Sequence, residues 1–250
     1  MTTPAWSVPA DQSGRRASWQ VLTASERGAA HISMQMPNQD SYGYERAGAE
    51  GMVAAVADGH GHSRHLRSAR GSHLAVRISC QVAQELADQI EGGLLPQATP
   101  GAVAGLVEEF LVPEVVNRWR DAVLADVEAD PFSEAEQGQR QHGDDPTIAY
   151  GSTLLLGMTL GDWLILAQIG DGEVVGVRTD GQAIRPVPDD PQLDGLVTTS
   201  LCGPDARSDF RVAVVDTTQT PLFAVLLATD GYGNAQLVDD WPSAFSADLV

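Results

Sequence analysis

The stretch Met52-Val53-Ala54-Ala55-Val56-Ala57-Asp58-Gly59-His60-Gly61-His62 holds six apolar residues and then an aspartate that opens a loop of glycine and histidine. An apolar run without alternation is typical of a strand that is buried on both faces. Glycine after the aspartate lets the chain turn sharply where the strand ends. The stretch therefore predicts a central strand, residues 52–57, that presents the Asp58 carboxylate at one end.

Two other apolar runs end in the same way. Residues 163–169 lead into Gly170-Asp171-Gly172, and residues 223–228 lead into Thr229-Asp230-Gly231. A further aspartate closes the segment Asn38-Gln39-Asp40. Strands that each expose a carboxylate at one end can bring several negative charges to one point, and such a point is unstable without cations. We therefore expect a centre for hard metal ions.

Composition narrows the class of protein. The chain has 250 residues, of which 43% are hydrophobic, with a formal net charge of -19 and a pI near 4.4. This length and hydrophobic content predict one domain of sandwich or layered type with a sizeable core. The negative charge repels phosphate backbones and anionic lipid surfaces, so we expect no nucleic-acid and no membrane binding. Divalent cations and basic protein segments fit the charge better.

The residue types exclude some chemistry. All fifteen basic residues are arginine, which removes Schiff-base lysines and the lysine of a phosphate-binding P-loop. Cys80 and Cys202 have no metal-ligand spacing and are expected to be reduced and packed, although a pairing between them stays open.

The N-terminal residues are not expected to form a secretory signal. Residues 1–14 lack the apolar segment of a secretory signal, and the longest apolar runs are too short to span a membrane. We expect a soluble cytoplasmic protein with a flexible arm, residues 1–18, and one domain, residues 19–250.

The first half of that domain predicts strands and then helices. Strands are expected at residues 18–23 and 40–45, before the strand at 52–57. An amphipathic helix follows, because an apolar residue recurs at every fourth position from Leu74 to Ile90. A second helix begins near Pro100 and runs to about Val127, with Pro113 either kinking it or starting a new segment.

The second half predicts mainly strands. Residues 130–149 lack apolar periodicity and are expected to form a mobile surface connection. Strands at 153–160 and 163–169 should form a hairpin, and the pairs Asp171-Gly172 and Asp180-Gly181 should continue an antiparallel meander. Two further strands are expected at 210–215 and 223–228. This order predicts an α+β fold with sheets covered by helices.

The glycine-flanked aspartates suggest a mechanism. The side chains of Asp58 and Asp230 and the Gly59 carbonyl can bind Mg²⁺ or Mn²⁺, and two such ions about 3.5–4 Å apart can lower the pKa of a shared water and clamp a phosphoryl oxygen. A leaving serine or threonine alkoxide then needs a proton. His60 is placed to supply it, and we expect nearby carboxylates to stabilise its protonated ring.

At this point the chain resembles a known family, the metal-dependent type 2C serine/threonine phosphatases, in particular its bacterial members. The resemblance spans most of residues 20–240 and rests on the following segments: Gly28 to His31, Asn38-Gln39-Asp40-Ser41, Asp58-Gly59-His60-Gly61, Gly151-Ser152-Thr153-Leu154, Ile169-Gly170-Asp171-Gly172 and Ala228-Thr229-Asp230-Gly231.

The resemblance implies a β-sandwich of two mainly antiparallel sheets flanked by pairs of helices, and hydrolysis of phosphoserine or phosphothreonine in proteins. It further implies that Asp58 bridges two Mg²⁺ or Mn²⁺ ions, that Gly59 gives its carbonyl, and that Asp230 holds the first ion. By the same resemblance Asp40, with its neighbour Gln39, lies at the second ion, Asp171 holds a third, weaker one, and His60 is the general acid.

Two departures from the family pattern stand out. The family pattern ends with another aspartate and a last strand, and residues 1–250 contain no such segment, so we expect that a ligand and a C-terminal strand are missing. Asp239-Asp240 is too close to Asp230 to serve and reads as the start of a helix at Trp241-Pro242. The family's phosphate-binding arginine is also absent from its usual place, where His31 is the nearest match and Arg27 is close by.

Plainer interpretations remain open for these residues. An Asp-Gly pair is usually a simple turn, and His60 can be a solvated loop residue. Arg64, Arg67 and Arg70 either steer a phosphoprotein towards the metals or form a solvated helix face beside acidic neighbours. A non-catalytic binding or regulatory module that lacks the last ligand is the rival to an enzyme. A sheet edge left open by a missing strand would favour a homo-oligomer.

Overall fold

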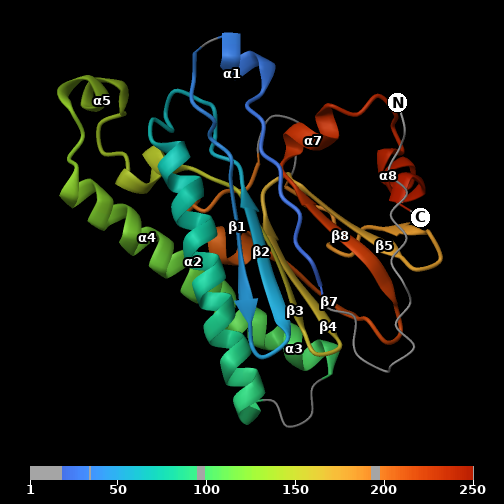
Figure 1. Cartoon of the computed structure of the whole chain (residues 1–250). Helices are drawn as coiled ribbons and strands as arrows, with labels where there is room; N and C mark the ends of the chain where they lie inside the picture. The colour runs from blue at the N-terminus through green and yellow to red at the C-terminus, as the bar shows by residue number, and fades with distance from the viewer. Residues whose placement is uncertain (1–18, 34, 95–98, 193–197, 250) are drawn as a thin grey trace.

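The computed structural model describes residues 19–33, 35–94, 99–192 and 198–249. The predicted arm at residues 1–18 lies outside them. Two antiparallel sheets form a sandwich (Figure 1), one of five strands in the order β1-β2-β3-β4-β7 and one of three in the order β6-β5-β8. The strands are β1 (Ser41–Ala47), β2 (Gly51–Ala57), β3 (Leu154–Leu160), β4 (Trp163–Ile169), β5 (Glu173–Arg178), β6 (Ala183–Ile184), β7 (Arg211–Asp216) and β8 (Leu222–Ala228).

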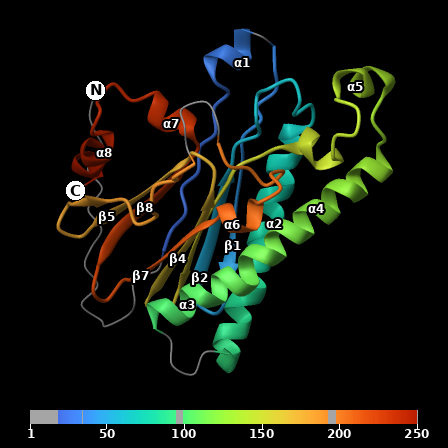
Figure 2. The same ribbon diagram turned by 180° about the vertical axis from the view of Figure 1, so that it is seen from behind.

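Helices cover one face of the larger sheet. The α-helices are α1 (Ala29–Ser33), α2 (Ser68–Gln89), α3 (Pro100–Leu106), α4 (Val112–Ala129), α5 (Glu134–Gln139), α6 (Ala206–Asp209), α7 (Asp230–Asn234) and α8 (Trp241–Leu249). Helix α2 packs on β1, β2 and β3, helix α3 packs on β7 and β4, and α4 lies against α2. From behind, α4 is seen on the side of the molecule away from β5 and β8 (Figure 2). The predicted α+β sandwich with flanking helices is therefore confirmed.

The two faces of the larger sheet pack against different layers, which explains why β3 and β4 are apolar throughout. In β3, Leu154 and Leu156 belong to the core under the helices, whereas Leu155 belongs to the core between the sheets. In β4, Ile165 and Leu166 divide in the same way. Strands that are covered on both sides have no polar face, so their residues do not alternate.

The turn after β4 differs from the prediction. The hairpin between β3 and β4 at Gly161 is confirmed. The predicted meander is wrong at the next turn, because Gly170-Asp171-Gly172 carries the chain from the larger sheet into the smaller one, where β5 pairs with β6 and β8. Gly170 has φ 101, which favours glycine, and a Cβ there would lie 2.4 Å from a side-chain atom of Thr153.

Several other element predictions need correction. Residues 19–28 form no strand. Residues 130–149 are not a structureless connection, because they contain α5, which has a Ser133–Glu136 capping box, and the 3₁₀ segment Pro146–Tyr150. Pro113 lies in the first turn of α4, directly after the π-helical segment Val107–Leu111, so it starts a segment of one continuous helical stretch. The helix at Trp241 is confirmed as α8.

Within the described residues, no helix has the length and apolarity that a membrane span requires. In that same part of the chain, one edge of β8 pairs with β5 and the other edge pairs with no strand. An oligomer through the other edge of β8 stays a prediction.

The contact of α2 with the 3₁₀ segment gives a test of the fold. A Cβ added at Gly71 would lie 1.8 Å from the Tyr150 carbonyl oxygen, and the Trp119 indole donates to the Gly71 carbonyl at 3.0 Å. We expect Gly71→Ala to lower the free energy of unfolding by roughly 2–4 kcal/mol, because α2 must move off its neighbour. Urea denaturation followed by circular dichroism measures the change.

The matched control is Gly105→Ala in α3, where a Cβ meets nothing within 4 Å. Alanine there should stabilise the helix by about 0.5–1 kcal/mol. Equal unfolding midpoints for the two variants would contradict the close packing at Gly71.

Candidate metal centre

Strand register brings the first two aspartates together. Ser41 pairs with Ala57 in the antiparallel ladder of β1 and β2. Asp40 precedes β1 and Asp58 follows β2, so the two residues are opposite each other one step beyond the last pair. Their side chains share a hydrogen bond. The strand ends predicted from the apolar run at residues 52–57 thus produce the predicted pair of carboxyl groups.

The smaller sheet contributes the other two aspartates at the same end of the sandwich. Glu173 in β5 pairs with Ala228 in β8, and Asp171 and Asp230 lie two residues beyond this pair. Asp230 is the first residue of α7, which lies beside the end of β8 near α1 (Figure 1). Asp58 also shares a hydrogen bond with Asp230. The site therefore spans the boundary between the two sheets.

Backbone and hydroxyl groups hold the loop after β2. The Asp58 carbonyl accepts from the Thr153 N–H at 2.9 Å, and the Asp58 N–H donates to Thr153 Oγ1 at 3.0 Å. The Gly59 N–H donates to the Gln39 carbonyl at 3.1 Å. A Cβ at Gly59 would lie 2.7 Å from the Ser68 backbone and 2.8 Å from that carbonyl. Only glycine fits, which fixes Asp58 and the Gly59 peptide against α2.

Burial and mutual repulsion raise the pKa of Asp58 and of Asp40. Burial raises the pKa of Asp58 to about 8, and the charges of Asp40 and Asp230 contribute to this rise. Burial likewise raises the pKa of Asp40, and the charge of Asp230 adds to this, while the hydrogen bond with Asp58 and the charge of His31 oppose it. A divalent cation at this point would replace the protons and remove the repulsion.

Asp171 lies to one side of this group. Burial raises its pKa, the charge of Asp230 raises it further, and the charge of Arg211 opposes the rise. Arg211 in β7 donates to the Pro188 carbonyl at 2.8 Å and to the Gly170 carbonyl. The guanidinium thus holds the turn that carries Asp171. Sequence reasoning missed Arg211, whose only signal is a charge at the start of an apolar strand.

The oxygen atoms of these residues fit hard cations, and the carboxyl groups are arranged as two hydrogen-bonded pairs that share Asp58. Carboxylate and carbonyl oxygens are the ligands that Mg²⁺ and Mn²⁺ prefer. Among the described residues no three His, Cys, Asp or Glu side chains already stand at metal-ligand spacing, whereas Asp58 hydrogen-bonds separately to Asp40 and Asp230. Carboxyl groups that share protons point at each other, and ligands must instead point at one ion. The residue types therefore fit a centre for hard metal ions, although the described side chains do not stand at ligand spacing.

His60 is half-buried beside this group and faces another way. Its Nε2 lies 2.8 Å from Ser200 Oγ, which donates to the Ser152 carbonyl at 3.1 Å. Because that hydroxyl proton is used, His60 Nε2 donates to Ser200 Oγ. Burial lowers the pKa of His60 to about 4, and the charge of His65 contributes to this fall.

The expectation that carboxylates stabilise a protonated His60 is therefore wrong for this structure, since burial and His65 dominate its surroundings. Sequence reasoning missed Ser200, which lies 140 residues away from His60 in the chain. The role of His60 as general acid stays a prediction, and the neutral ring counts against it.

His31 lies at the rim of the site. It belongs to α1, and its charge acts on Asp40. A Cβ built at Gly61 would lie 3.7 Å from His31 Nε2, so His31 reaches the loop that follows Asp58. Its role in binding phosphate stays a prediction, but its position beside Asp40 is suitable.

The three arginines after the loop do not form a free positive rim. Arg64 donates to the Asp144 carboxylate at 3.1 Å, and Arg70 pairs with Asp126 and Asp130. The interpretation that they partner acidic neighbours is confirmed. Their solvation is not uniform, because Arg67 is only 7% exposed. It donates to Glu136 Oε1 at 2.7 Å and to the Tyr150 hydroxyl at 3.0 Å, and so fastens α5 to the start of α2.

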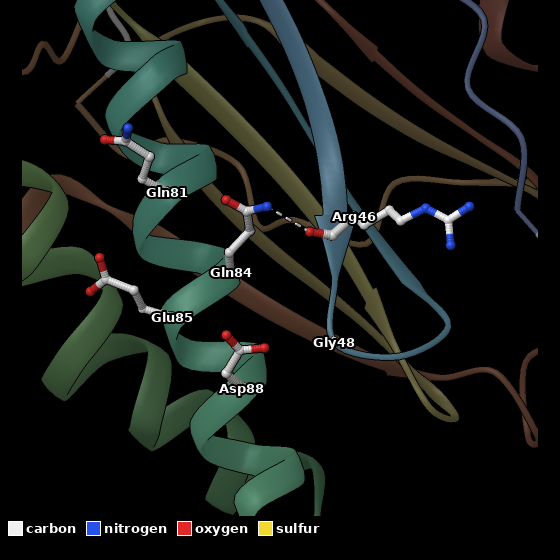
Figure 3. Close-up of a pocket in the computed structure, with 6 residues that line it drawn as sticks. All are labelled: Arg46, Gly48, Gln81, Gln84, Glu85 and Asp88. Atoms are coloured by element: carbon white, nitrogen blue, oxygen red, sulfur yellow. Dashed lines mark hydrogen bonds between the residues drawn. The ribbon is translucent and has the colours of Figure 1, made fainter.

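Two hollows differ in their distance from this site. The larger, of about 540 Å³, lies between α2 and the far end of β1, with Gln81, Gln84, Glu85 and Asp88 on the helix side (Figure 3). None of the four aspartates lines it. The smaller, of about 190 Å³, includes Asp171 and Arg211 in its wall. Of the two, the smaller hollow borders the candidate metal centre.

Comparisons with known proteins agree with this fold. The chain matches the family described as Protein phosphatase 2C over residues 27–248. No curated protein sequence matches the chain. The fold is similar to that of a bacterial serine phosphatase, with TM-score 0.53 and 12% identity over 84% of this chain and 79% of that one.

Two further solved structures are similar. A point mutant of a bacterial serine phosphatase has TM-score 0.52 and 11% identity over 82% of this chain and 76% of that one. The catalytic domain of the serine threonine protein phosphatase PstP, solved in complex with 2 manganese ions, has TM-score 0.44 and 20% identity over 85% of this chain and 82% of that one. At these identities the likenesses to the bacterial serine phosphatase structures show the fold alone.

The raised pKa of Asp58 makes stability depend on pH. The folded protein holds a proton on Asp58 that the unfolded chain releases above its ordinary pKa of 3.8. The free energy of unfolding of the metal-free protein should therefore fall as pH rises from about 4 to about 8. We expect Asp58→Asn to flatten this slope and to raise stability at pH 8 by about 1 kcal/mol or more. Urea titrations in chelator at several pH values measure it.

Asp121→Asn, at an exposed position on α4, is the matched control and should keep the original slope. The same slope in both variants would contradict the electrostatic arrangement around Asp58.

Proposed function

The chain belongs to the protein phosphatase 2C family, and on that premise we propose that it hydrolyses phosphoserine or phosphothreonine in proteins with the help of Mg²⁺ or Mn²⁺. Family and fold support protein phosphatase activity in general. The observation that carries the finer proposal is the position of Asp58, which hydrogen-bonds to Asp40 from its own sheet and to Asp230 from the other.

We assign the ion ligands to the residues at this boundary. Asp58 would bridge two ions, the Gly59 carbonyl and Asp230 would complete the first position, Asp40 would serve the second, and Asp171 would hold a weaker third. When bound, such ions supply a water of lowered pKa and neutralise phosphate charge. The raised pKa of Asp58 supports this assignment, because it indicates an excess of negative charge that cations would relieve.

Other residues of the chain would position the substrate and hold the loop that carries the ion ligands. His31 at the rim would bind a phosphate oxygen, since it lies beside Asp40 and reaches the loop at Gly61. Thr153 and Gln39 hold the loop that carries Asp58 and Gly59, so the backbone of these two residues is fixed before substrate arrives. We expect a phosphoprotein substrate and a cytoplasmic location.

The rival proposal is a non-catalytic binding or regulatory module. The structure gives it one argument, namely that no three of the described acidic, histidine or cysteine side chains already stand at ligand spacing. Calorimetric titration with Mn²⁺ separates the two proposals. Tight occupancy by two ions favours the enzyme, and a single weak site favours the module.

Activity gives the direct test. We expect Mn²⁺-stimulated release of phosphate from a phosphothreonine peptide, which chelation abolishes and Asp58→Asn reduces at least about a thousandfold, because the bridging carboxylate is lost. Malachite-green detection of phosphate measures it. Asp121→Asn should keep full activity. Release that is indifferent to chelator, or unaffected by Asp58→Asn, would overturn the metal mechanism.

Two substrates with different leaving groups can distinguish a structural role of His60 from a role as general acid. If His60 only supports the loop through Ser200, as its half-buried neutral ring indicates, His60→Gln should slow p-nitrophenyl phosphate and a phosphothreonine peptide by the same factor and lower the melting temperature. A general acid matters far more for the poorer leaving group, the threonine alkoxide. Comparing kcat for both substrates decides the matter, and a loss confined to the peptide would restore the acid role.

A further inference from the structure

The free edge of β1 runs beside α2. In the larger sheet β1 pairs only with β2, so among the described residues its other edge faces no strand. Ser41 Oγ lies 3.0 Å from Ser72 Oγ near the start of β1, and Gln84 Nε2 donates to the Arg46 carbonyl at 2.9 Å near its end. The strand and the helix therefore run side by side from the metal centre to the hairpin that follows β1.

The bond from Gln84 shows which backbone groups point away from the sheet. Because the Arg46 carbonyl accepts from a helix side chain, the backbone of Arg46 is turned to the free edge. Alternate residues of a strand direct their N–H and C=O groups to opposite sides, so those of Tyr42 and Tyr44 are turned to this edge as well. Both tyrosines are exposed, at 47% and 49%. This edge therefore offers backbone donors and acceptors to an added strand.

The hollow of about 540 Å³ lies where this edge ends. Gln81, Gln84 and Asp88 line it from α2 (Figure 3). Arg46 also borders it, but in the same view its guanidinium points away from α2. The space beside the end of β1 is therefore polar, and a carboxylate of α2 faces it.

The acidic side chains here are not all neutralised. Asp88 and Glu45 are exposed and form no ion pair in the part of the chain that the structure describes, whereas Glu85 is held by Arg118 at 2.7 Å. Glu45 lies on the α2 side of β1, because its charge adds to the burial that raises the pKa of Cys80 to about 12. The edge and the hollow thus fit an extended segment with basic side chains, and the net charge of -19 favours its approach.

The position of this edge links it to the metal centre. Asp40 directly precedes β1, and Gly48 at the hollow directly follows it. An extended segment laid along β1 from one to the other spans about six to eight residues. The larger sheet is antiparallel throughout, and an added antiparallel strand would run towards Asp40. Basic residues at the hollow would then precede the residue that reaches the metal centre.

We propose that the free edge of β1 and the hollow at its end form a docking site for the protein substrate. The substrate binds there as an added antiparallel strand and places basic side chains beside Glu45 and Asp88, about six to eight positions before the phosphorylated residue. The inference rests on the proposed phosphatase function and adds to it the class of phosphoprotein that the enzyme prefers.

Two phosphothreonine peptides of the same composition test the position of the basic residues. One carries a pair of arginines about seven positions before the phosphothreonine, and the other carries the pair about seven positions after it. With the full chain and Mn²⁺, we expect kcat/KM to be about tenfold higher for the first peptide, mainly through a lower KM. The difference should shrink in about 0.5 M salt, because exposed charges are screened.

Variants of the enzyme test the acidic side chains. Glu45→Gln combined with Asp88→Asn should make the two peptides equal and should leave the hydrolysis of p-nitrophenyl phosphate unchanged, since neither residue lies at the metal centre. Asp121→Asn on α4 is the matched control, because it removes an exposed carboxylate away from β1. It should keep the preference for the first peptide.

N-methylation of the first peptide tests the added strand. Methyl groups are placed one at a time on the residues between the arginines and the phosphothreonine. We expect kcat/KM to fall at every second position only, because alternate N–H groups of an added strand point towards β1. A uniform effect along the peptide would overturn the added strand and with it the proposal.

The remaining outcomes separate this inference from the proposed function. Equal kcat/KM for the two peptides, or a preference that survives in the double variant, would overturn the docking site and leave the phosphatase intact. If no substrate, p-nitrophenyl phosphate included, releases phosphate in a metal-dependent way, the proposed function and this inference are overturned together.

Discussion

The repulsion between half-buried carboxyl groups at the strand ends is the constraint on which the site depends. Asp40 and Asp58 come from the larger sheet and Asp230 from the smaller one, and burial together with their mutual charge raises the pKa of Asp58 to about 8. A fold driven by stability alone has no reason to keep such a group. The surrounding contacts, from Thr153, Gly59 and Gln39, hold the aspartates together in spite of it. Carboxyl groups whose pKa is strongly shifted by burial and by neighbouring charges are typical of functional sites.

Much of this arrangement could be predicted from the sequence because it follows from local patterns. Apolar runs that end in aspartate and glycine located β2, β4 and β8, and strand register then made neighbours of Asp40 and Asp58. The four-residue periodicity from Leu74 located α2. These signals depend on residues close together in the chain, where the period of the pattern and the geometry of the element coincide.

What could not be predicted depends on contacts between distant segments. The turn at Gly170 was taken for part of a meander, because nothing in a turn sequence states which sheet the next strand joins. The order of residues 130–149 comes from Arg67, which lies more than sixty positions away and bonds to Glu136. His60 was expected to carry a proton, and only the fold reveals that Ser200 and His65 surround it. Burial and partner identity are properties of the whole structure.

The division of the aspartates between the sheets has a consequence for cooperativity. Asp40 and Asp58 belong to one layer, and Asp171 and Asp230 belong to the other. The two layers otherwise meet through the small apolar cluster around Leu155 and Leu166. An ion bound at this boundary would therefore link the two layers through its ligands. Ligand binding stabilises only the state that contains the complete site. The concentration of free divalent ions would therefore determine whether the two layers melt as one unit or the smaller layer separates first.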